Sequence, residues 1–210
     1  MKNIAICGEG YTALTLYIGG LLSALGEKVI ITDAVCDRPI DYCLNVPKEI
    51  EIRADIYSFK GIDYTRMENV PSSSHTVMIS LYGTKEPIEE SDMIIAVFKE
   101  SGEAYARMLG NAYPTAAETI LVIEDSLGLA TKEFKAFAKD KGFRDIITLP
   151  MNKKDIAARL RLELASELAI KKTSGQVQKF LFNLIRTILP DTDEKAFAKA
   201  VKKCEKGGRR

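Results

Sequence analysis

Hydrophobic residues follow one pattern up to about residue 150 and a different one after it. The first part contains short apolar runs, bounded by turn residues and rich in β-branched side chains, which predict buried strands. These runs cover residues 4–7, 28–33, 76–81, 93–98, 119–123 and 146–150. Helical spacing occurs between some of them, so strands and helices alternate along this part of the chain.

The first 33 residues predict a strand, a helix and a second strand. After residues 4–7, apolar side chains recur with a helical period up to Leu25, and Gly26 stands where a helix end favours glycine. The region from 34 to 71 is less periodic, with Pro39, Pro47 and Gly61 as breakers and one strand expected near 50–59. A further helix is expected over 131–141. This alternation predicts a three-layer α/β fold with a mainly parallel sheet.

From residue 155 the pattern becomes wholly helical. One apolar stripe contains Ile156, Leu160, Leu164 and Leu168. A second contains Val177, Phe180, Leu181, Leu184, Ile185 and Ile188, and Pro190 ends that helix. A last short helix is expected over 193–203. We therefore expect one domain over 1–210, with a sheet-forming core (1–150), C-terminal helices packed on it (151–204) and a flexible tail (205–210).

The composition predicts a soluble, globular protein. The chain has 210 residues, 46% hydrophobic and 28% charged, and a net charge of +1, which gives no global field for nucleic acid. Its four cysteines have no C-x-x-C spacing, which argues against a zinc site and a disulfide framework. No apolar run is long enough to span a membrane. We expect a cytoplasmic protein with no metal.

A glycine turn joins the first strand to the first helix, and it is the main candidate for a binding site. Its sequence matches G-x-G-x-x-A and consists of Gly8, Glu9, Gly10, Tyr11, Thr12 and Ala13. Asp33 follows about 20 residues later at the end of the second strand, where a dinucleotide fold places the acid that binds the ribose. One interpretation is therefore NAD or another dinucleotide, with the pyrophosphate over the turn. The alternative is structural: the glycines only turn the chain, Glu9 and Thr12 cap the helix, and Asp33 binds a loop.

Residues 18–33, IGGLLSALGEKVIITD, carry a resemblance to a known family. A helix ending in Leu-Gly, followed by a strand ending in Asp, resembles the MinD/ParA-like deviant-Walker ATPases. Residues 75–83, 91–97 and 147–150 are similar to later segments of that family, in the same order. The resemblance, which spans about residues 3–160, implies a P-loop NTPase-like three-layer α/β/α fold.

This sequence departs from the family at the residues that handle phosphate. A P-loop requires G-x-x-x-x-G-K-[ST], but the stretch from Gly8 to Leu25 has no lysine or arginine. Glu9 stands where the family has its signature lysine. The strand that should end with a carboxylate near the metal instead reads Met78-Ile79-Ser80-Leu81. We therefore expect a non-hydrolysing pseudo-ATPase with no catalytic residue and no cofactor, acting through protein partners, a homodimer included. Pilus-associated members of the family suggest a role in assembling or positioning a pilus or secretion apparatus.

The alternative function is an NAD(P)-binding or other dinucleotide-binding Rossmann-type protein that uses the turn and Asp33. Strand order separates the two, because a dinucleotide fold has the order 3-2-1-4-5-6. Other polar residues carry less weight. His75 follows three serines, but a loop pair of this kind seldom forms a catalytic site. Lys85 is read as a solvated lysine, and Lys153, Lys154, Arg159 and Arg161 as a helix face paired with acids.

Overall fold

The computed structural model describes residues 1–9, 11–33, 39–44, 56–66, 74–83, 90–99, 118–125, 132–143 and 145–206. Within these residues, eight strands form one sheet in the order β3-β4-β2-β5-β1-β6-β7-β8. All neighbouring strands are parallel except the β3–β4 pair. The strands are β1 (Lys2–Gly8), β2 (Val29–Asp33), β3 (Tyr57–Phe59), β4 (Ile62–Thr65), β5 (Val77–Gly83), β6 (Met93–Lys99), β7 (Glu118–Asp125) and β8 (Asp145–Pro150).

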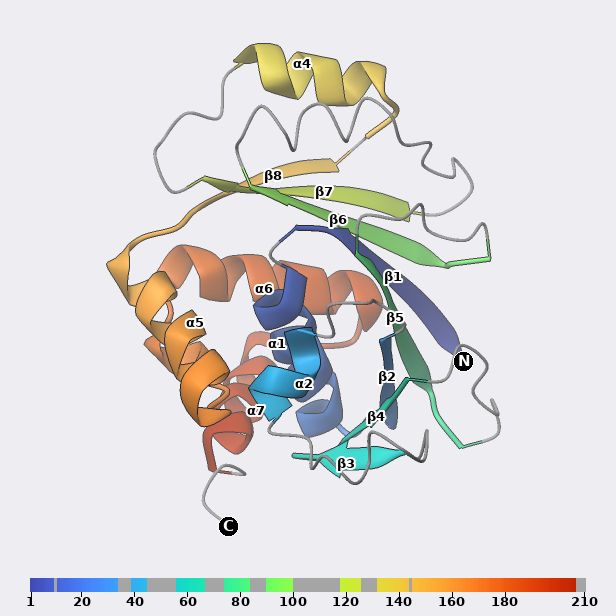
Figure 1. Cartoon of the computed structure of the whole chain (residues 1–210), viewed down its shortest axis with the longest axis vertical. Helices are drawn as coiled ribbons and strands as arrows, with labels where there is room; N and C mark the ends of the chain where they lie inside the picture. Colours follow the sequence, from blue (N-terminus) through green and yellow to red (C-terminus); the bar gives the residue numbers. More distant parts are fainter. Residues whose placement is uncertain are drawn as a thin grey trace.

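Helices cover both faces of the sheet, so the molecule has three layers (Figure 1). Helix α4 lies over β6, β7 and β8 on one face, and the other described helices lie on the opposite face. The helices are α1 (Tyr11–Leu25), α2 (Pro39–Leu44), α4 (Lys132–Asp140), α5 (Lys153–Ala165), the short 3-10 helix η2 (Ile170–Lys172), α6 (Gly175–Ile188) and α7 (Glu194–Lys206). The expected three-layer α/β/α fold with a mainly parallel sheet and a helical C-terminal segment is confirmed.

Side chains of the central strands alternate between two hydrophobic cores, because successive residues of a strand point to opposite faces. Ile4 and Ile6 of β1 join the core beneath α1, whereas Ala5 and Cys7 join the core beneath α4. The same alternation runs along β6 and β7. This double burial explains why these strands have nearly continuous apolar sequences rather than alternating ones.

Helix α1 is buried on almost every side. An unbroken run of its residues from Ala13 to Leu22 is buried, as expected for a helix with apolar residues all around. Two adjacent glycines allow close packing on opposite sides. A Cβ at Gly19 would lie 3.3 Å from Ile31 of β2, and a Cβ at Gly20 would lie 2.8 Å from Leu168, in the segment between α5 and η2. The sheet and the C-terminal helices therefore enclose α1 between them.

Three details differ from the sequence expectations. Pro39 begins α2 rather than breaking the chain, because the first position of a helix needs no backbone N–H. The strand expected near 50–59 is described only over β3, and β4 follows it after a two-residue turn at Lys60 and Gly61, both with positive φ. The stripe from Ile156 to Leu168 is not one helix face, because α5 ends before the left-handed Ser166.

None of the described helices combines the length and the apolar character that a bilayer crossing requires.

Candidate functional site

The carboxyl ends of the parallel strands, where α1 begins, form the region in which this class of fold binds ligands. Gly8 ends β1 with a φ of +103°, and a Cβ there would lie 2.0 Å from the backbone oxygen of Val97 on β6. The amide of Glu9 donates a hydrogen bond to the same oxygen, at 2.7 Å. Gly8 is therefore required by backbone conformation and by close contact with β6.

The other residues of the turn have different surroundings. Tyr11 begins α1 and is buried, and its carbonyl accepts a hydrogen bond from the Thr15 hydroxyl at 2.9 Å. Thr12 is half-buried and is the second residue of the helix, so it does not occupy the capping position before the first turn. Ala13 is buried. Gly10 lies outside the described residues, and Glu9 is half-buried at the start of the turn.

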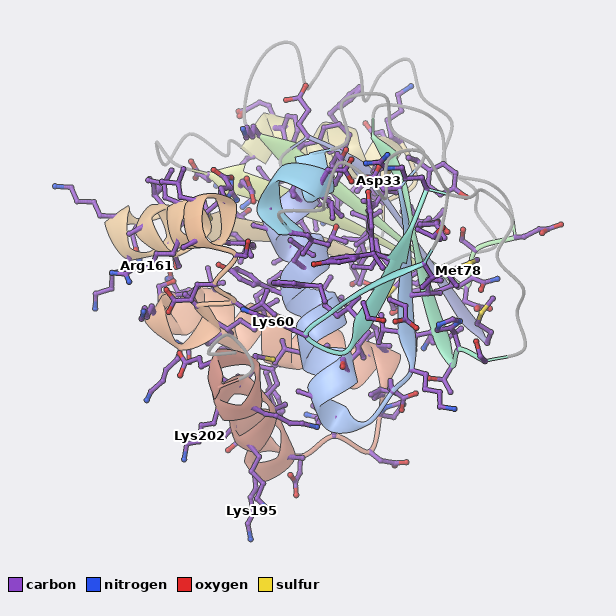
Figure 2. The ribbon with its side chains drawn as sticks, turned by 60° about the horizontal axis from the view of Figure 1, so that its bottom comes forward. Asp33, Lys60, Met78, Arg161, Lys195 and Lys202 are labelled. Carbon is purple, nitrogen blue, oxygen red and sulfur yellow. The ribbon has the colours of Figure 1, made fainter. Side chains whose placement is uncertain are left out.

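Asp33 is buried at the carboxyl end of β2 (Figure 2), within a group of polar side chains from β4 and α2. The Tyr64 hydroxyl lies 2.7 Å from Oδ1 of Asp41 and 3.4 Å from Oδ2 of Asp33. Arg66 forms an ion pair with Asp41. Burial, together with the two carboxylates, raises the pKa of Tyr64 well above its usual range, so this hydroxyl stays a donor at neutral pH.

The sheet does not bring Asp33 next to the glycine turn. Strand β5 lies between β2 and β1, and it pairs with both of them. Adjacent strands are about 4.8 Å apart, so β1 and β2 are separated by about 10 Å. In the dinucleotide-binding order the first and second strands are neighbours, which places the acid beside the turn. The arrangement seen here lacks that adjacency.

Ser80, in the segment of the sequence where a metal-side carboxylate was sought, lies in the middle of β5 and pairs with Ala5 of β1. Ser80 accepts a hydrogen bond from the Thr32 hydroxyl at 3.1 Å, which ties β5 to β2. The next described residues of β5 are Leu81, Tyr82 and Gly83. Lys85 lies outside the described residues. The described ends of β1 and β5 therefore provide no lysine for a phosphate.

A polar cluster at the ends of β7 and β8 was not predicted as a site. Glu124 of β7 is buried and forms an ion pair with Arg159 of α5. Asp155, 3% exposed, accepts hydrogen bonds from the amides of Ser174, at 2.6 Å, and Asn152, at 3.2 Å. The only sequence signal was a pair of acids, Glu124 and Asp125, at the end of an apolar strand. Arg159 was expected on an exposed helix face with neighbouring acids; it is paired with an acid, but it is half-buried and that acid lies on β7.

A small cavity of about 30 Å³ adjoins this cluster, between α1, α5 and α6. Ala13 and Tyr17 of α1 line it, together with Glu124 and Arg159. The Tyr17 hydroxyl and Nε of Arg159 are buried there without a protein hydrogen-bond partner. The volume suits one or two bridging water molecules. It is far too small for a nucleotide base, so this cavity is not a preformed nucleotide pocket.

His75 lies at the opposite end of the sheet from the glycine turn, just before β5. Its Nε2 is 2.9 Å from Oδ2 of Asp63, and its Nδ1 is 3.1 Å from the Ser74 hydroxyl. The Ser58 hydroxyl donates to the other oxygen of Asp63. These contacts fasten the start of β5 to β4 and lie away from the ligand-binding edge.

Comparisons with known proteins support the fold rather than a family. A ParA family ATPase from Chlorobium tepidum TLS has a similar structure, with a TM-score of 0.51 and 11% identity over 100% of this chain and 98% of that chain. A variant of Era from Aquifex aeolicus, bound to GDP.AlF4-, matches with a TM-score of 0.33 and 16% identity over 92% of this chain and 58% of that chain. No family model and no curated protein matches the sequence. The likeness to the ParA family ATPase shows that the chain has a P-loop NTPase-like α/β fold.

Proposed function

We propose that this chain is a non-hydrolysing protein with a ParA-like fold, which acts through protein contacts. The observation that carries this proposal is the glycine turn itself. Its first amide, that of Glu9, is bonded to Val97 rather than turned toward a ligand, and Gly8 packs against the same carbonyl. The turn and helix from Gly8 to Leu25 contain no lysine or arginine that could hold a phosphate.

Electrostatics support the same conclusion. Phosphoryl transfer depends on cations placed around the phosphates, because the protein mainly positions the groups and neutralises charge. Here the turn contributes the carboxylate of Glu9. At about 4 Å, one carboxylate repels one phosphate charge by about 1 kcal/mol in water and by about 4 kcal/mol at an effective dielectric of 20. A triphosphate carries several negative charges, and Glu9 would repel each of them while the turn provides no cation to compensate.

The cellular process in this proposal comes from the resemblance to pilus-associated MinD/ParA-like proteins, namely assembly or positioning of a pilus or secretion apparatus. The dinucleotide alternative receives no support from the strand order, because β5 separates Asp33 from the turn.

An ATPase assay on the purified chain tests the proposal. We expect no magnesium-dependent release of phosphate by the wild-type protein, at a rate no higher than that of Gly10→Val prepared in the same way. The valine variant serves as a control for contaminating ATPases. Magnesium-dependent turnover that Gly10→Val abolishes would overturn the proposal.

A further inference from the structure

An apolar ridge lies on the outer surface of α5, and no described part of the chain covers it. Ile156 is 46% exposed, Leu160 is 47% exposed and Leu164 is 82% exposed. The described part of the chain has five exposed large hydrophobic residues, and three of them belong to this ridge. The other two are Met1 and Ile56. In both views α5 lies at the outer edge of the molecule (Figures 1 and 2).

The rotation of α5 about its axis is fixed by contacts on the opposite side. Asp155, Ala158 and Leu162 are its buried residues. Asp155 is held by the amide of Ser174, and Arg159 by Glu124. Lys60, from the β3–β4 turn, donates to the carbonyl of Ser166 at 2.6 Å and so anchors the carboxyl end. The ridge therefore faces outward because polar contacts hold the inner face in place.

The ridge has the spacing with which helices pack on one another. Residues four apart form a row that fits the groove between corresponding rows of a second helix, with a crossing angle of about −50°. At 3.6 residues per turn, Leu160 lies at the centre of the exposed face, opposite the buried residues. Arg161 lies on one flank of that face, with its Nη1 3.7 Å from Oε2 of Glu167 in the same chain, and Glu163 lies on the other flank; both Arg161 and Glu163 are exposed. Figure 2 shows Arg161 at the outer side of α5.

The two flanks carry opposite charges, so one copy of this helix face is complementary to another copy of it. We propose that the ridge of Ile156, Leu160 and Leu164 binds the same ridge of a second copy of this chain. A two-fold axis along the mean helix direction makes the helices run in the same direction and places each Arg161 beside the Glu163 of the other copy. An antiparallel pair would place the Arg161 flanks together, and like charges would repel. The charge pattern thus selects the parallel pair.

An anionic membrane fits this face less well. An interfacial helix presents a broad apolar face with basic residues along its polar side. The ridge here is one side chain wide, and Glu163 borders it at a position that would contact the lipid headgroups. A narrow ridge between opposite charges is a feature of helix pairing.

The contact is expected to be weak. A stable interface usually buries about 800 Å² on each partner, and one helix pair alone provides less. Association should therefore depend on concentration. In sedimentation equilibrium from micromolar to near-millimolar protein, we expect the average mass of the wild type to rise from one chain toward two. Leu160→Glu should remain monomeric throughout, whereas Ile56→Glu, a charge at an exposed hydrophobic residue elsewhere, should behave as the wild type.

Charge exchange tests the orientation. Arg161→Glu and Glu163→Arg should each weaken association, roughly three- to tenfold, because each leaves like charges facing across the pair. The double variant should restore it, since opposite charges face each other again. In addition, Leu160→Cys should form a disulfide with itself across the two-fold axis on mild oxidation, and Ile56→Cys should not.

The proposal is wrong if the wild type stays monomeric at the highest concentration, or if Leu160→Glu still forms dimers. It is also wrong if the charge-exchanged double variant does not recover association. Binding of the ridge to anionic vesicles without self-association would favour a membrane instead. Circular dichroism and melting curves of each variant show that it is folded. The inference goes beyond the proposed function and can fail separately from it, because the ridge variants do not touch the glycine turn.

Discussion

Gly8 is glycine for two separate reasons, a positive φ and a missing Cβ against Val97, and the two can be measured separately. Gly26 also has a positive φ, +108°, but no atom lies within 4 Å of the Cβ it would carry. An alanine at Gly26 therefore meets only the conformational cost, about 1–2 kcal/mol. An alanine at Gly8 adds a clash at 2.0 Å with backbone that cannot move without disturbing β6.

We expect Gly8→Ala to lower the free energy of unfolding by at least about 3 kcal/mol, and Gly26→Ala by about 1–2 kcal/mol. Urea denaturation followed by circular dichroism gives both values. Equal losses in the two variants would mean that β1 can shift away from Val97 and that Gly8 serves only the turn.

At the scale of residues, the sequence predicted the conformational role of a single residue better than it predicted which side chains contact each other. The turn at Gly8 was visible because glycine between a strand and a helix has a direct conformational cause. The Glu124–Arg159 pair joins residues 35 apart, and the Tyr64 hydroxyl links residues of β2 and α2. Such pairs depend on which elements become neighbours, and no local pattern contains that information.

Helices α5 and α6 carry apolar stripes of similar appearance in the sequence but have opposite environments. All six stripe residues of α6 are buried, as the sequence analysis required for a helix packed on the core. On α5 the stripe faces outward, because the ion pair of Arg159 and the hydrogen bonds of Asp155 lie on the inner face. Periodicity predicts that a helix has an apolar face, and the polar contacts on its other face decide which way that face points.

The same substitution in the two helices should therefore have different effects. Leu181→Ala, at a fully buried position of α6, should lower the free energy of unfolding by about 2–5 kcal/mol. Leu164→Ala, at an 82% exposed position of α5, should change it by no more than about 0.5 kcal/mol when measured at a concentration that keeps the chain monomeric. Chemical denaturation of both variants is the measurement. A large loss in Leu164→Ala would show that this residue is covered in the folded monomer.

Across the whole molecule, the alternation of strands and helices was enough to predict three layers, because a parallel sheet needs crossover helices on its faces. The order of strands was not predictable in the same way. Strand β5 inserts between β1 and β2, although some forty residues separate it from β2 along the chain. Only this order distinguishes the two interpretations of Asp33, since both place the acid at the end of the second strand.

The strand order leads to a prediction about ligands. A ligand at 100 times its Kd stabilises a protein by about 2.7 kcal/mol, which raises the Tm of a chain of this size by roughly 5–10 °C. We expect neither NAD nor magnesium-ATP to raise the Tm measurably, because Asp33 is about two strands from the glycine turn and the turn carries Glu9 instead of a cation. Glu9→Lys should not create ATP hydrolysis, because the loop stays shorter than the family's and Ser80 supplies no carboxylate to hold the metal.

Differential scanning calorimetry over a series of ligand concentrations measures these shifts. Asp33 is buried, so Asp33→Ala lowers the Tm by itself, and the relevant quantity is the additional shift caused by the ligand. Asp33→Asn, which keeps the shape of the side chain, is the matched control for that loss. A dose-dependent rise with NAD that both Asp33 variants remove would show that the turn and the acid act together across β5, and the dinucleotide interpretation would then replace the proposed function.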